Sequence, residues 1–121
     1  MLFKQITLQN FRQFKDKVTI TFSTDSLKNV TIIMGENGTG KTSLEQAFTW
    51  CLYNKTAFKD EDIFSKASKP EMQIGQKKDT FVELVFTHGS VEYTLRRTMT
   101  YQMQSDGKTV KAKSGECKLT Y

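Results

Sequence analysis

The sequence predicts an α/β protein with α+β character, in which β-rich, mixed or antiparallel sheets surround one central helix. Two observations favour this fold. Most apolar residues alternate with polar ones in short runs, which is typical of strands with one buried face. One segment, residues 41–53, has helical spacing instead. Its apolar residues lie three and four positions apart: Leu44, Ala47, Phe48, Cys51 and Leu52.

Length and composition indicate a single folded unit. With 121 residues, 37% of them hydrophobic and 12% aromatic, the chain can build one core but not two. We expect residues 1–121 to form one partial domain. Residues 1–54 would hold the first strands, a phosphate loop and the helix, and residues 80–121 an antiparallel β-subdomain. The net charge of +5 suits a nucleic-acid partner or an ordinary solvated surface equally well.

Three strands are predicted before the helix. Residues 2–9 and 18–23 alternate apolar and polar side chains, and the polar turn between them favours an antiparallel pair. Residues 29–34, NVTIIM, form a nearly continuous apolar run, which is typical of a strand buried on both faces.

After the helix, residues 55–79 are charged and predict a surface excursion with a short helix at residues 60–66. Two strands follow, at residues 80–87 and 91–102, joined by the turn His88-Gly89-Ser90. Beyond a second turn at residues 105–107 the pattern allows one or two further short strands.

The cysteines and the chain's apolar runs exclude several classes. Cys51 lies on the predicted buried face of the helix, and Cys117 has no partner at metal-ligand spacing, so neither a disulfide framework nor a zinc site is indicated. No signal peptide and no apolar run long enough to span a membrane is visible. We expect a cytoplasmic protein with no membrane partner.

The segment GENGTGKTS matches the phosphate-binding pattern GxxxxGK[ST] between a predicted buried strand and an amphipathic helix. The glycines let backbone N–H groups approach phosphate oxygens, Lys41 would reach the β- and γ-phosphates, and Thr42 would bind Mg²⁺. Ser43 can donate to the α-phosphate. The predicted nucleotide-binding residues in the loop are Gly35, Glu36, Asn37, Gly38, Thr39, Gly40, Lys41, Thr42 and Ser43.

A catalytic acid for hydrolysis is not visible. P-loop ATPases hold Mg²⁺ with an acidic residue at the end of a second apolar strand. No Asp of this sequence ends such a run, and Glu83 and Glu92 lie inside predicted strands. No catalytic residue is therefore assigned, and the chain alone is expected to bind nucleotide without hydrolysing it.

The motifs resemble the N-terminal lobe of the ATPase heads of the SMC, RecF and SbcC group, which are ABC-type, DNA-associated enzymes. The resemblance rests on NFRQF at residues 10–14, the phosphate loop with its helix, and the paired VELVF and VEYTLRR. NFRQF is most similar to DndD-like proteins of DNA phosphorothioation and phage defence. The resemblance implies ATP and Mg²⁺ as cofactors. It also implies that Arg12 approaches the nucleotide phosphates and that Asn37 faces the γ-phosphate side.

The resemblance further implies partners: a C-terminal lobe and coiled coil of the same ATPase, a second head and DNA. A C-terminal lobe would carry the signature motif, the acidic residues and the switch histidine, so we expect this chain to be an N-terminal piece of a larger ATPase. His88, the one histidine, matches no switch position.

Two other functions are compatible with the motifs. A small P-loop kinase would use the same loop, although such kinases have parallel sheets. A non-enzymatic nucleic-acid-binding β-module would use the basic segment at residues 96–118, with Arg96 and Arg97 at a solvated strand end. Only Tyr101 and Tyr121 are expected to expose aromatic rings there, so no base-stacking platform is evident.

Overall fold

The computed structural model describes residues 2–22, 38–56 and 58–121. The strand predicted at residues 29–34 and the first loop residues, Gly35, Glu36 and Asn37, lie outside the described residues. The backbone of the helix is described from Gly38, and its side chains from Ser43 onward.

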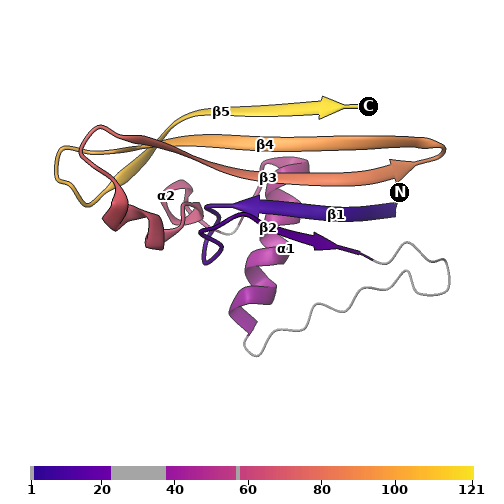
Figure 1. Cartoon of the computed structure of the whole chain (residues 1–121), viewed down its shortest axis with the longest axis horizontal. Helices are drawn as coiled ribbons and strands as arrows, with labels where there is room; N and C mark the ends of the chain where they lie inside the picture. Colours follow the sequence, from indigo (N-terminus) through magenta and orange to yellow (C-terminus); the bar gives the residue numbers. More distant parts are fainter. Residues whose placement is uncertain (1, 23–37, 57) are drawn as a thin grey trace.

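The described strands form one sheet of five, in the order β2-β1-β3-β4-β5 (Figure 1). Every neighbouring pair is antiparallel. Their bounds are β1 Leu2–Gln9, β2 Val18–Thr21, β3 Lys77–His88, β4 Val91–Met103 and β5 Val110–Thr120. The predicted antiparallel, β-rich architecture is confirmed, and the strands of residues 77–120 continue the sheet begun by β1 and β2.

Three strand boundaries differ from the sequence prediction. β3 begins at Lys77 rather than at residue 80, because Lys77 pairs with Gln102 and extends the ladder through polar residues. Such an extension is stabilised by backbone hydrogen bonds and needs no apolar side chains, so the alternation of apolar residues could not predict it. β5 is one strand of 11 residues rather than one or two short ones. β2 ends at Thr21.

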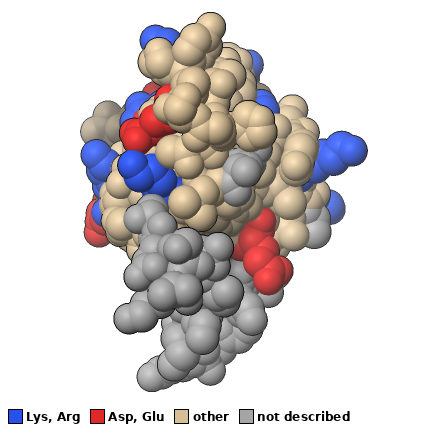
Figure 2. Space-filling model, turned by 90° about the vertical axis from the view of Figure 1, so that its right-hand side faces the viewer, with Lys and Arg blue, Asp and Glu red and all other residues tan. Residues whose placement is uncertain are grey.

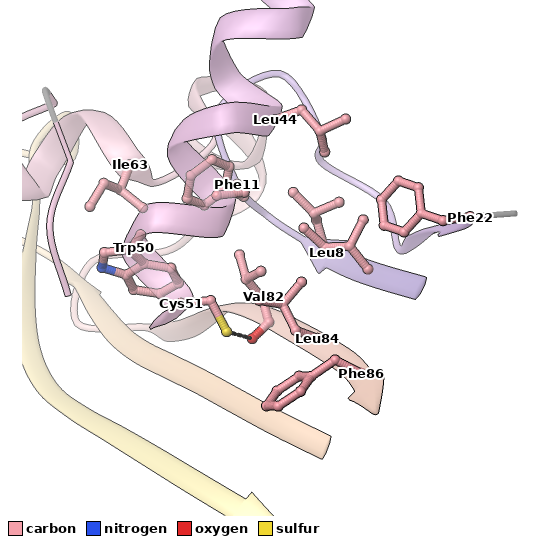
Figure 3. Packing of buried hydrophobic residues seen from close by; sticks show 12 residues of the cluster. Leu8, Phe11, Phe22, Leu44, Trp50, Cys51, Ile63, Val82, Leu84 and Phe86 are labelled. Atoms are coloured by element: carbon pink, nitrogen blue, oxygen red, sulfur yellow. Dashed lines mark hydrogen bonds between the residues drawn. The ribbon is translucent and has the colours of Figure 1, made fainter. Parts of the chain in front are cut away.

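A single long helix, α1 (Gly38–Tyr53), packs across one face of the sheet (Figures 1 and 3). It begins at Gly38, whereas the sequence predicted a start at residue 41. The prediction missed the first turn because that turn carries no apolar residue. The predicted face is confirmed, since Leu44, Ala47 and Cys51 are fully or almost fully buried. Trp50, which falls outside the predicted stripe, is buried as well, at 2% exposure.

The sheet presents matching residues to α1. Leu8 of β1 is the cross-strand partner of Val82 in β3, and Ile6 is the partner of Leu84. All four side chains are fully buried in the cluster that contains α1. Pairs of branched side chains on one face of neighbouring strands are the unit that stabilises a sheet. This face therefore fixes the direction in which α1 crosses the strands.

The segment predicted as a surface excursion is partly buried, and this correction follows from its tertiary contacts. It contains a short helix, α2 (Asp60–Ile63), which ends before the predicted residue 66, and a 3₁₀ helix, η1 (Lys66–Glu71). Ile63, Phe64 and Met72 of this segment are buried despite the charged surroundings, whereas Ile74 is 65% exposed. Phe64 and Met72 form a second cluster together with strand residues: Tyr101, Met103 and Val110.

Tyr101 belongs to this second cluster, so its predicted exposure is wrong. The residue is 0% exposed, and its ring centroid lies 5.0 Å from that of Phe64. Tyr121, at 86% exposure, is open as expected. The difference arises because η1 and the chain before it cover the end of β4, which the local alternation of β4 cannot reveal.

Cys51 is buried as predicted. Its thiol donates to the carbonyl of Val82 at 3.3 Å, and burial raises the pKa of the thiol to about 12, so the group stays protonated (Figure 3). Cys117 is exposed. In the part of the chain that the structure describes, no helix has the length and apolar character needed to cross a membrane.

Candidate nucleotide-binding site

The phosphate-loop pattern runs into the N-terminus of α1. Gly38 is the first helical residue, so Gly38, Thr39, Gly40 and Lys41 provide the first four N–H groups of the helix. The first four N–H groups of an α-helix have no carbonyl partner within it, and the helix dipole places partial positive charge there. This end of α1 can therefore accept an anion.

Ser43 supplies an independent observation in the second turn of the same helix. The residue is only 1% exposed, and its Oγ has no hydrogen-bond partner among the described residues. A buried hydroxyl without a partner costs about 1–3 kcal/mol. A ligand oxygen that accepts from Ser43 would remove this cost, which is the role that the sequence assigned to Ser43.

Arg12 lies three residues after the end of β1, in a backbone conformation with a φ of 53°. Its N–H donates to the carbonyl of Ile63 at 2.8 Å, and its Nη1 donates to the carbonyl of Asp62, also at 2.8 Å. The guanidinium carbon lies 3.9 Å from the centroid of the Phe58 ring. These contacts attach Arg12 to α2 and to the segment that precedes it.

A hollow opens beside Arg12. It has a volume of about 370 Å³ and is lined by Arg12, Asp62, Phe64, Ser65 and Lys66, among others. Arg12 Nε and Ser65 Oγ are both buried atoms without a hydrogen-bond partner in the described part of the chain. Two of the three such atoms therefore belong to residues at this hollow, and the third is Ser43 Oγ.

Ser65 and Phe58 are not among the residues that the sequence pointed to. Both follow the phosphate-loop helix, in a segment whose charge indicates a solvent-exposed excursion. Ser65 is nevertheless 1% exposed, and its N–H donates to the carbonyl of Asn10 at 3.1 Å. The sequence around Ser65 and Phe58 does not indicate their burial or contacts, because their partners, Asn10 and Arg12, lie in the turn after β1.

Arg96 and Arg97, weighed as nucleic-acid contacts, are both engaged within the chain. Arg96 Nε lies 2.9 Å from a carboxylate oxygen of Glu83, and its guanidinium stacks 4.1 Å from the Phe81 centroid. Arg97 Nε donates to the carbonyl of Cys51 at 3.2 Å. On the described part of the face drawn in Figure 2, basic groups lie beside acidic ones.

Across the described residues, no group of three or more His, Cys, Asp and Glu side chains could hold a metal ion. Mg²⁺ arriving with a nucleotide would instead meet the one protein ligand that the sequence assigns, the hydroxyl of Thr42. The side chain of Thr42 lies outside the described part of the structure.

Comparison with known proteins places these features in a family. A model described as the AAA domain matches residues 5–120. A DNA double-strand break repair Rad50 ATPase of Thermoplasma acidophilum is 35% identical over 101 residues, which cover 83% of this chain and 10% of that protein. A chromosome partition protein Smc of Desulfitobacterium hafniense is 30% identical over 77 residues, covering 60% of this chain and 6% of that protein.

Among solved structures, an SMC head domain from Thermotoga maritima superimposes with a TM-score of 0.62 at 23% identity. The match covers 99% of this chain and 37% of the head domain. The fold of this chain is therefore that of part of an SMC head. The chain spans only about a tenth of the length of the Rad50 ATPase that it matches.

Proposed function

The chain belongs to the AAA domain family, and from this membership we propose that it is the ATP-binding lobe of a DNA-associated ATPase of the SMC and Rad50 type. Its resemblance to the ATPase heads of such proteins extends over nearly the whole chain. The function proposed for the lobe is to hold MgATP at the N-terminus of α1.

One observation carries the proposal: the buried, unpartnered hydroxyl of Ser43, in a helix whose first residues belong to a GxxxxGK[ST] pattern. The large majority of buried side-chain polar atoms have a hydrogen-bond partner, so an unpartnered serine at 1% exposure supports a ligand at this end of the helix. A phosphate oxygen satisfies Ser43 and the free N–H groups together.

In the proposed site, each residue of the loop contacts the nucleotide through a different chemical group. Residues 35–40 approach the phosphates through backbone N–H groups, with Asn37 on the γ-phosphate side. Lys41 neutralises the β- and γ-phosphates, and Thr42 binds Mg²⁺. When bound, Mg²⁺ would supply positive charge that offsets the negative charge of the ATP phosphates. Arg12 is proposed to reach the same ligand from the end of β1.

We assign hydrolysis to a larger assembly. The chain corresponds to 37% of an SMC head domain and to about a tenth of the Rad50 relative. The proposed partners are a C-terminal lobe and coiled coil of the same ATPase, a second head and DNA in the cytoplasm. NFRQF favours a DndD-like parent, whereas the relatives compared above are named for break repair and chromosome partition.

Titration calorimetry with MgATP tests the proposal. The chain should bind MgATP with a Kd in the micromolar to millimolar range, about −8 to −4 kcal/mol. Lys41→Ala should weaken binding at least about tenfold, while Lys113→Ala, which removes an exposed charge on β5, serves as the matched control. Equal affinity in the wild type and Lys41→Ala would contradict the nucleotide site.

A phosphate-release assay tests the second part of the proposal. The chain alone should show no steady turnover of MgATP, because no acidic residue has been assigned to activate water. Steady release that Lys41→Ala abolishes would show that the chain hydrolyses ATP by itself. The kinase alternative predicts phosphate transfer to a nucleoside monophosphate, and the antiparallel pairing of all described strands argues against it.

A further inference from the structure

β5 forms one edge of the sheet, and its outer side carries no described strand (Figure 1). Residues 114–120 of β5 pair with β4 in unbroken register, after an irregularity that leaves Lys113 without a cross-strand partner. All residues of this unbroken segment are exposed. An exposed edge strand presents a row of backbone N–H and C=O groups that can pair with a further strand. The unbroken segment is therefore the part of this edge that is best suited to accept one.

The hydrogen bonds at the end of β4 show which backbone groups of β5 point to the free edge. Met103 N–H donates to the carbonyl of Gln76 at 2.9 Å, on the side of β3. Gln104 N–H donates to the carbonyl of Thr109 at 2.8 Å, on the side of β5. Because this direction alternates along an antiparallel strand, the even-numbered residues of β4 bond to β5, where their partners are residues 114, 116, 118 and 120. The residues between those partners direct their N–H and C=O groups to the free edge: Gly115, Cys117 and Leu119.

These outward groups restrict how a second copy of the chain can pair with β5. When two identical strands pair antiparallel about a twofold axis, one residue lies opposite itself. The outward groups of both copies meet only where that residue is Gly115, Cys117 or Leu119. Cys117 is the middle residue of the unbroken segment, so pairing about it uses all of that segment. This register places Glu116 opposite Lys118 of the second copy. It also places Gly115 opposite Leu119 of the second copy.

The charges of β5 complement each other in the register about Cys117. Glu116 and Lys118 are exposed, and no ion pair within the described residues involves either of them. Directly opposed residues on neighbouring strands have Cβ atoms about 4.5–5.5 Å apart, and opposite charges at such positions stabilise the sheet. The twofold axis repeats the pair, so both charges of each copy are matched. Pairing about Gly115 or Leu119 would place neither charge opposite the other.

The apolar side chains match in the same register, on the face of the sheet that carries α1. Leu119 is 52% exposed and lies opposite Leu95 of β4, which packs against the cluster that contains α1. Gly115 has no side chain, and a hollow of about 170 Å³ beside it is lined also by Met99 and Arg97. A glycine inside a strand often marks the close approach of another chain. Leu119 of the second copy would cover the hollow beside Gly115.

We propose that β5 is a dimerisation edge, along which two copies of the chain pair antiparallel about a twofold axis at Cys117. The two sheets then join into one continuous sheet across β5. The occupant is a second copy because the charges and the apolar side chains of β5 are complementary to those of β5 itself. The inference goes beyond the proposed function: it uses no residue of the nucleotide site at α1, and the dimer should form without nucleotide.

Analytical ultracentrifugation of the 121-residue chain without nucleotide tests the dimer. The interface is small, so we expect a dimer Kd of about 10–500 μM. Lys118→Glu and Glu116→Lys should each weaken dimerisation at least about fivefold, because like charges then face each other in both pairs. The variant with both changes restores opposite charges and should dimerise within about twofold of the wild type. Lys108→Glu, an equal charge change in the exposed turn before β5, is the matched control and should dimerise as the wild type does.

A thiol cross-link tests the register. Cys117 is exposed, whereas burial raises the pKa of the Cys51 thiol to about 12, so a short bis-maleimide should react at Cys117 alone. Above the Kd it should link most wild-type dimers, because paired Cα atoms at this position lie about 5.5 Å apart. The variant Cys117→Ser with Ser105→Cys moves the thiol to the exposed turn after β4 and should give only the cross-linking of random collisions.

Three results would overturn the proposal. The first is a chain that stays monomeric up to about 1 mM, which would leave the edge to a strand of a different protein. The second is a dimer that the two single charge reversals do not weaken, or that the double variant does not restore. The third is a dimer that gives no cross-link at Cys117. Circular dichroism spectra like that of the wild type establish that each variant is folded, since the changed side chains are exposed.

Discussion

Asn10 and Arg12 flank Phe11 at the end of β1, and they differ in what becomes of their polar atoms. Both have a positive φ, 59° for Asn10 and 53° for Arg12, and both reach the segment after α1. Asn10 is 4% exposed and fully engaged by the fold. Arg12 retains a buried Nε without a partner among the described residues.

The contacts of Asn10 join three parts of the chain. Its Nδ2 donates to the carbonyl of Asp79 at 3.3 Å, and its Oδ1 accepts from the hydroxyl of Ser68 in η1. Its main-chain carbonyl accepts from Thr80 Oγ1 at 2.7 Å and from the N–H of Ser65 at 3.1 Å. Such a satisfied buried network specifies one arrangement of β1, β3 and η1.

The hollow at Arg12 is built from two of these parts, the turn after β1 and the segment after α1, yet two of its donors are left over. A polar cluster that only holds the fold together pairs its groups, as the Asn10 cluster does. The Asn10 cluster therefore serves the fold, whereas the Arg12 hollow keeps two polar atoms that no described residue satisfies. Substitutions in the two clusters should therefore change the stability to different extents.

The largest effect on stability is expected from Asn10→Ala. The change leaves the Ser68 hydroxyl without its acceptor and places alanine at a φ of 59°, where L side chains other than Asn and Asp are strained. The free energy of unfolding should fall by about 2–4 kcal/mol in urea denaturation. A loss below about 1 kcal/mol would show that the network is not structural.

Thr80→Val and Ser65→Ala should change the free energy of unfolding less than Asn10→Ala does, and by different amounts. Valine has the shape of threonine, so Thr80→Val removes only the hydroxyl that donates to Asn10 and should cost about 1–1.5 kcal/mol. Ser65→Ala removes a hydroxyl that has no partner and should change the free energy of unfolding by less than about 0.5 kcal/mol. Equal losses in the two variants would remove the contrast between the clusters.

The smallest effect is expected at Asp106, a satisfied polar group that is exposed. Its carboxylate accepts from the Thr109 hydroxyl at 2.7 Å and from two backbone N–H groups of the same turn, which lower its pKa from the ordinary 3.8 to about 2. A lowered pKa in the folded state contributes stability above pH 3.8, and this contribution is lost as the pH falls through about 2.

Asp106→Ala should therefore lower the melting temperature slightly at pH 7, and the difference from the wild type should become much smaller near pH 2. Thermal unfolding followed by circular dichroism at both pH values measures this. Glu116→Ala, on exposed β5, provides a control without such a turn. A difference between wild type and Asp106→Ala that is unchanged at pH 2 would mean that the turn is stabilised by something other than the carboxylate.

The features that the sequence predicted correctly are local ones. Alternation located β1, β3 and β4, the spacing of Leu44, Ala47 and Cys51 identified the buried face of α1, and the antiparallel architecture is confirmed. Each depends on neighbours within a few positions of the chain. The nucleotide-binding roles of the phosphate-loop residues, Ser43 included, stay a prediction, and the side chains before Ser43 lie outside the described residues.

The features that the sequence missed depend on distant contacts. Tyr101 alternates like an exposed strand residue but is covered by Phe64, and the charged segment after α1 contributes Phe64 and Met72 to a core. The charged sequence around Ser65 predicts an exposed serine, because the residue that binds it is distant in sequence. Its position is set by a hydrogen bond to Asn10, which lies before the phosphate loop.

By itself, then, the sequence determined an amphipathic helix and a set of alternating strands, because backbone propensity and side-chain period act over short distances, and it predicted a phosphate-binding loop. The tertiary structure decided which polar atoms are paired. Folding brings Asn10 to Ser68 and Thr80, and Arg12 to Asp62, across separations of 58, 70 and 50 positions in the chain. Whether a buried donor is satisfied or left for a ligand depends on those partners, and no local pattern contains them.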